Sequence, residues 1–92
     1  MEHEHPVELT ITLPANGKLD GPALRGYLEG ELRTRAEVTA AEGTSVTVRA
    51  YRREEVESVA DELIAKLSAI GVPDGSAVRW VDDNGADVVR PV

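Results

Sequence analysis

The spacing of apolar residues changes period near the middle of the chain, and this change predicts a strand that leads directly into a helix. Between Thr44 and Tyr51, apolar and polar side chains alternate, as in a strand with one buried face. Farther on, apolar positions fall three and four apart, which predicts an amphipathic helix with the stripe Val56, Val59, Ala60, Leu63, Leu67 and Ile70. Gly71 and Pro73 predict its end, since glycine accepts the left-handed cap and proline cannot continue a helix.

Alternation predicts four further strands, at residues 7–13, 36–40, 77–82 and 87–90. With the strand at 44–51 this makes five strands, and turn residues separate two pairs of them. Glu42-Gly43 is typical of a hairpin turn before the strand at 44–51, and Asn84-Gly85 predicts a two-residue hairpin turn before the last strand.

A first helix is predicted over residues 21–33, with Asp20 as its N-cap and Pro22 in its first turn. Its apolar stripe consists of Leu24, Tyr27, Leu28 and Leu32. Gly26 and Gly30 lie four residues apart in this segment. Two interpretations stay open, tolerated surface glycines or a close approach of another backbone, and the first is favoured because this spacing is informative chiefly in membrane helices.

The resulting order is strand, helix, strand, strand, helix, strand, strand. Right-handed crossovers place the third strand between the first two and the fourth strand on the other side of the first. Both helices then cover one face of an antiparallel sheet, and the last strand pairs outside the fourth. This order resembles the α+β ferredoxin-like fold, a split βαβ sandwich, with one added C-terminal strand. No sequence motif carries the resemblance, so it implies a fold and no function.

The sheet face without helices is the predicted interaction face. Its proposed members are Thr10, Thr12, Thr39, Thr47, Arg49, Tyr51 and Arg79. A solvated face and a contact with a protein, including a second copy of the chain, both remain open. The edge strand at 36–40 is an alternative route to a dimer. Nucleic acid is disfavoured because stacking needs more aromatic side chains than Tyr51.

Composition narrows the possible partners. The net charge of −7 argues against nucleic acid and against anionic membranes. The absence of cysteine excludes disulfides and thiolate chemistry, and it fits a cytoplasmic protein. Residues 1–5 are expected to form a flexible leader and residues 6–92 one domain. Eight arginines against two lysines, with abundant alanine and valine, indicate a GC-rich and bacterial source.

Several patterns resemble reactive or ligand-binding sites, but each has a simpler interpretation. His3 and His5 lie beside two glutamates, a combination that binds metals, yet a terminal tract has no outer residues to orient the ligands. The acidic run from Asp82 to Asp87 does not fit a calcium loop, because the chain ends before the last ligand position. Gly17-Lys18 lacks the glycine and hydroxyl positions of a phosphate loop.

One basic cluster, Arg49, Arg52 and Arg53, offers an anion site near the start of the second helix. The favoured interpretation is local pairing, with Arg53 contacting Glu57 and the strand arginines contacting Glu8 or Glu37. The acidic residues of that helix are expected to form a solvated face. Trp80 is expected in the core.

These observations predict a non-enzymatic protein–protein interaction module without cofactor or metal, acting as a homo-oligomer or as an accessory subunit of a larger assembly. The alternative is a regulatory domain that binds an anionic metabolite through Arg49, Arg52 or Arg79. An enzyme with a ferredoxin-like fold is the third possibility.

Overall fold

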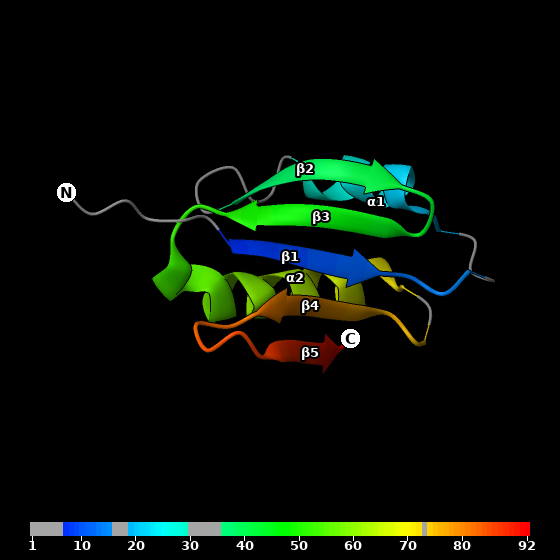
Figure 1. Cartoon of the computed structure of the whole chain (residues 1–92). Coiled ribbons are helices and arrows are strands. Elements are labelled where there is room, and N and C mark those ends of the chain that lie inside the picture. The colour runs from blue at the N-terminus through cyan, green and yellow to red at the C-terminus, as the bar shows by residue number, and fades with distance from the viewer. Residues whose placement is uncertain (1–6, 16–18, 30–35, 73) are drawn as a thin grey trace.

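The computed structural model of the chain describes residues 7–15, 19–29, 36–72 and 74–92. These form an α+β structure with a five-strand antiparallel sheet. The elements are β1 (Val7–Thr12), α1 (Gly21–Leu28), β2 (Ala36–Glu42), β3 (Ser45–Ala50), the 3-10 helix η1 (Arg53–Glu55), α2 (Val56–Ile70), β4 (Ala77–Val81) and β5 (Asp87–Pro91). Figure 1 shows α1 behind β2 and β3 and α2 behind β1 and β4, so both helices cover the same face.

The strand order is β2-β3-β1-β4-β5, and every neighbouring pair is antiparallel. The third strand lies between the first two, the fourth lies on the other side of the first, and the fifth pairs outside the fourth. The predicted placement of the strands is therefore confirmed. The order differs from a four-strand ferredoxin-like sheet by β5.

Local sequence explains where α1 begins. An Asp20 side-chain oxygen accepts a hydrogen bond from the Ala23 backbone N–H at 3.0 Å, and Pro22 occupies the first turn, as predicted. Glu29 is the C-cap, and the rest of the predicted 21–33 helix lies outside the described residues. The placement of Tyr27 on the buried stripe was wrong, since 58% of its surface is exposed.

The second strand departs from simple alternation. A β-bulge shifts its register between Val38 and Ala40, so that Ala40 pairs with Thr47 and Ala41 packs against the core. The strand is also longer than predicted, and its turn to β3 lies at Gly43-Thr44, one residue later. Ala40 is therefore exposed on the face opposite Ala36, because one extra residue reverses the alternation that follows it.

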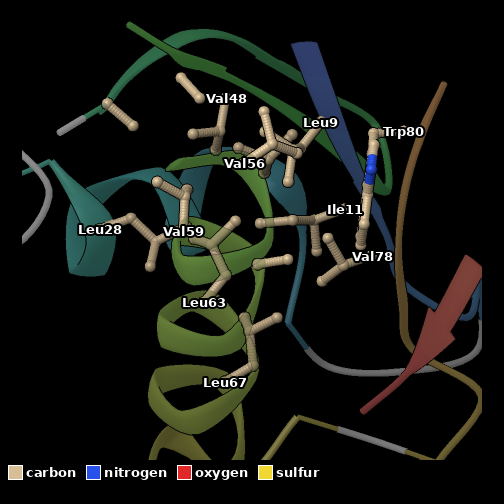
Figure 2. Close-up of a cluster of buried hydrophobic side chains, with 14 of the residues drawn as sticks. Leu9, Ile11, Leu28, Val48, Val56, Val59, Leu63, Leu67, Val78 and Trp80 are labelled. Carbon is tan, nitrogen blue, oxygen red and sulfur yellow. The ribbon is translucent and has the colours of Figure 1, made fainter. Parts of the chain in front are cut away.

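The core lies between the sheet and the helices. Figure 2 shows Leu9, Ile11 and Val78 from the sheet facing side chains of α2. The predicted α2 stripe is buried from Val56 to Leu67, with Ile70 partly buried beyond it. Gly71 ends the helix at φ +88°, as predicted. Trp80 is 5% exposed, so its assignment to the core is confirmed.

Candidate functional site

Among the described residues, no element covers the sheet face opposite the helices, and we call it the open face (Figure 1). Register and alternation place these residues on it: Glu8, Thr10, Thr12, Glu37, Ala40, Glu42, Ser45, Thr47, Arg49, Ala77, Arg79, Val81, Asp87, Val89 and Pro91. Its centre, around Thr10 and Thr47, is built from small side chains. Charged residues are concentrated toward the end where β1 begins.

The structure brings most of the predicted interaction residues together. Thr47, Thr10 and Arg79 form one row across three strands, because Thr10 pairs with both of the others. Thr12 and Arg49 lie on the same face in adjacent rows. The central part of the predicted face is therefore a continuous surface.

Two predicted members lie outside these rows. Tyr51 follows the end of β3 in a bend. Thr39 sits at the bulge of β2, where its hydroxyl donates to the Thr47 carbonyl oxygen at 3.4 Å. Tyr51 lies outside the rows because β3 ends before it, and Thr39 lies outside them because the register of β2 shifts there. Alternation in the sequence shows neither feature.

Two exposed valines add an apolar part to the open face. Val81 and Val89 are 52% and 56% exposed, on neighbouring strands. Val89 was absent from the predicted face. It could have been found by extending the alternation from β4 through the hairpin, since Arg79 and Val89 are cross-strand partners.

The arginines of the open face hold carboxylates of the same chain. Arg49 contacts Glu37 on the neighbouring strand, as predicted, and Arg79 contacts Asp87 at 3.2 Å. All four side chains are partly exposed, so each pair contributes at most about 1 kcal/mol to stability. The main consequence of these ion pairs is that the positive charges of Arg49 and Arg79 are already balanced by carboxylates of the same chain.

The pairing of Arg53 differs from the prediction. Its guanidinium contacts Asp83 of the β4–β5 loop at 2.5 Å, whereas Glu57 contacts Arg90 at 3.7 Å. Arg53 therefore ties η1 to a loop 30 residues away. Sequence spacing identified the helical neighbour but not the loop that the fold places beside η1.

Arg90 closes the edge of the core, a role that the sequence analysis missed. Its guanidinium lies 5.3 Å from the centre of the Trp80 ring and 2.6 Å from an Asp61 carboxylate oxygen. The contact links β5 to α2, and the cation stacks on the outer side of the indole. No local pattern predicts it, because Arg90 and Asp61 are 29 residues apart.

The loop between β4 and β5 has five residues, 82–86, so the prediction of a two-residue turn was wrong. One Asp82 side-chain oxygen accepts hydrogen bonds from the backbone N–H groups of Asn84 and Ala86, both at 2.9 Å. Gly85 supplies the positive φ of +81°. The side chain of Asp82 thus adds to two backbone hydrogen bonds in the loop, from the Asp82 N–H to the Ala86 carbonyl oxygen and from the Gly85 N–H to the Asp82 carbonyl oxygen.

Replacing Asp82 by alanine should lower the free energy of unfolding by about 1 kcal/mol, because two backbone donors lose their acceptor. Urea unfolding followed by Trp80 fluorescence measures this change. Asp83→Ala is the matched control, since it removes only an exposed ion pair and should cost less than Asp82→Ala. Equal losses would show that Asp82 does not organise the loop.

A groove of about 400 Å³ lies between this loop and the start of α2, and we call it the end groove. It is lined by Val7, Arg53, Glu54, Val56, Glu57, Trp80, Val81, Asp82, Asp83 and Asn84. A second hollow, of about 800 Å³, adjoins it on the open face, and its lining includes Thr10, Arg49 and Arg79. The two depressions share Val7, Arg53, Trp80, Val81 and Asp82, so one depression runs around the end of the sheet.

Among the described residues, no group of three or more metal-binding side chains is close enough to hold an ion. His3 and His5 lie outside the described residues. Gly17-Lys18 lies there too. In the part of the chain that the structure describes, no helix has the length and apolar character needed to cross a membrane.

Comparison of the chain with protein-family models, with curated proteins and with solved structures gives no match.

Proposed function

We propose that the protein is a non-enzymatic interaction module that binds a protein partner, in the simplest case a second copy, through the open face. The supporting observation is that no described element covers one face of the five-strand sheet, where the small, uncharged Thr10 and Thr47 lie beside an arginine, Arg79, that is paired with Asp87. Threonine, alanine and valine suit close packing of a second sheet, which lies about 10 Å away in such pairs. The exposed Val81 and Val89 supply apolar area to bury.

The alternative, binding of an anionic metabolite, has less support. Arg49 and Arg79 hold Glu37 and Asp87, so an anion would have to displace a carboxylate. The net charge of −7 adds long-range repulsion. If this alternative were right, anionic metabolites would raise the melting temperature.

Dimerisation through a sheet edge is also disfavoured. The exposed edge strand β2 carries a bulge, and bulges interrupt pairing with another strand. At the other edge, Pro91 of β5 has no N–H to donate. Both features protect edges, which leaves the open face as the favoured route.

Three finer assignments belong to the same proposal. The order β2-β3-β1-β4, with both helices on one side, supports a ferredoxin-like fold extended by β5. The lack of cysteine supports a cytoplasmic location, and the arginine-rich, alanine-rich composition supports a bacterial source.

Thr10→Arg should abolish self-association, because it adds a long cation at the centre of the open face, beside Arg79. Sedimentation over a range of concentrations should show dimers of the wild-type protein and monomers of the variant. Ser68→Arg, on the exposed side of α2, is the matched control and should remain dimeric.

A wild-type protein that is monomeric at every concentration would rule out the second-copy form of the proposal. The accessory-subunit form would then predict a complex that Thr10→Arg disrupts and Ser68→Arg preserves. A complex insensitive to Thr10→Arg would place the interface elsewhere.

A further inference from the structure

The end groove combines an apolar floor with walls that carry excess negative charge. Val7, Val56 and Trp80 are the buried or half-buried residues of its floor, and the exposed Val81 borders it. Four carboxylates and one guanidinium line it, namely Glu54, Glu57, Asp82, Asp83 and Arg53. An occupant must therefore offer apolar surface and positive charge together.

The carboxylates come from two segments of the chain, which the Arg53–Asp83 ion pair links. Glu54 and Glu57 belong to η1 and α2, whereas Asp82 and Asp83 belong to the β4–β5 loop. Two of the four are partly matched within the chain, Asp83 by Arg53 and Glu57 by Arg90. The negative charge that is left comes from both segments.

The shape of the depression favours an extended occupant over a compact one. The end groove, about 400 Å³, is at the small end of the range for ligand sites, and it adjoins the hollow on the open face. A free amine would fill only one end of this path. A peptide in extended conformation can alternate apolar side chains toward the floor with cations toward the walls.

We infer that the end groove binds an extended segment of a protein partner in which lysine or arginine alternates with aliphatic residues. The end groove lies beside the open face, its adjoining hollow reaches Thr10, and peptide binding there does not require self-association. Anionic segments are repelled by the same carboxylates that attract the basic one.

The test uses the full chain and an acetylated, amidated hexapeptide of alternating lysine and leucine. Its binding should saturate, change the fluorescence of Trp80 and weaken as salt is raised. Two control peptides, with glutamate replacing lysine or serine replacing leucine, should bind at least tenfold more weakly. Equal binding of either control, or no saturable binding of the first peptide, would overturn the inference.

Charge reversal locates the site. Glu54→Lys should weaken peptide binding roughly three- to tenfold, since an exposed attraction becomes a repulsion of similar size. Glu42→Lys is the matched control at an exposed position of β2 and should bind as the wild type does. Equal weakening by both variants would mean that the peptide senses only net charge, which would also overturn the inference.

The open-face variant separates this inference from the proposed function. Thr47→Arg, at a position of the open face outside both depressions, should prevent self-association while leaving peptide affinity within about twofold of the wild-type value. Val81 and Thr10 stay unchanged in these peptide-binding variants because both lie on the open face and line the depression. Failure of peptide binding with normal self-association would refute the groove proposal alone.

Discussion

Leu63→Ala should lower the free energy of unfolding by about 2–5 kcal/mol, the largest effect that we expect from a single substitution. Leu63 is fully buried on α2 and belongs to the cluster in Figure 2. The chain has no phenylalanine, so valines, leucines and alanines fill most of the core. Branched side chains held between a helix and a sheet leave a cavity when one of them is truncated, because neighbouring backbones cannot collapse into it.

Urea unfolding followed by Trp80 fluorescence and by circular dichroism measures the Leu63 effect. Ile64→Ala is the control, since Ile64 is the next residue of α2 but only partly buried. It should cost clearly less than Leu63→Ala. If the two losses were equal, α2 would not pack on the sheet through the Leu63 side.

Gly21→Ala should lower the free energy of unfolding by about 1–3 kcal/mol, because it forces overlap with backbone atoms. A Cβ atom at Gly21 would lie 2.6 Å from the carbonyl oxygen of Ser45 and 3.2 Å from the backbone nitrogen of Glu42. The Gly21 N–H also donates to the Gly43 carbonyl oxygen at 2.9 Å, which fixes the start of α1 against the β2–β3 turn. Neither atom can rotate away as a side chain would.

For a domain of this size, such a loss lowers the melting temperature by roughly 4–20 °C, which thermal unfolding measures directly. Gly26→Ala is the matched control in the same helix. A Cβ there meets no atom within 4 Å, so alanine should stabilise the helix by up to about 1 kcal/mol. Opposite signs for the two variants are the expected result. A neutral Gly21→Ala would show that α1 does not rest on the turn.

The space around Gly21 and Gly26 also decides between the two interpretations of the helix glycines. Gly26 is exposed with open space around it, so its interpretation as a surface glycine is confirmed. Gly30 lies outside the described residues. The close backbone approach does occur in α1, but at Gly21, which sequence spacing did not single out. Proximity to the β2–β3 turn is a tertiary relation that no spacing along one helix records.

Elements defined by a repeated local pattern could be predicted from sequence. The stripe of α2 repeats over four turns, so its buried side, its left-handed end at Gly71 and the preceding strand β3 were all anticipated. The Asp20 cap was predicted for the same reason, since donor and acceptor are three residues apart. Crossover handedness then placed the strands in their observed order.

The candidate surfaces were only partly predictable. The row Thr47, Thr10 and Arg79 follows from strand alternation once the order is known. The end groove does not, because it exists only where η1, the start of β1 and the β4–β5 loop meet. Tyr27 shows the opposite failure, since its helical spacing fits the stripe while its side chain points to solvent.

The sequence by itself therefore determined which segments become helices and strands, which faces are apolar and how the strands are ordered. Only the tertiary structure decided the bulge in β2, the partners of Arg53 and Arg90, and the groove between the loop and α2. The physical reason is how far apart along the sequence the interacting residues lie. Periodicity and capping act between residues within a few positions, whereas these contacts join residues that are distant along the chain and are brought together by the packing of the core.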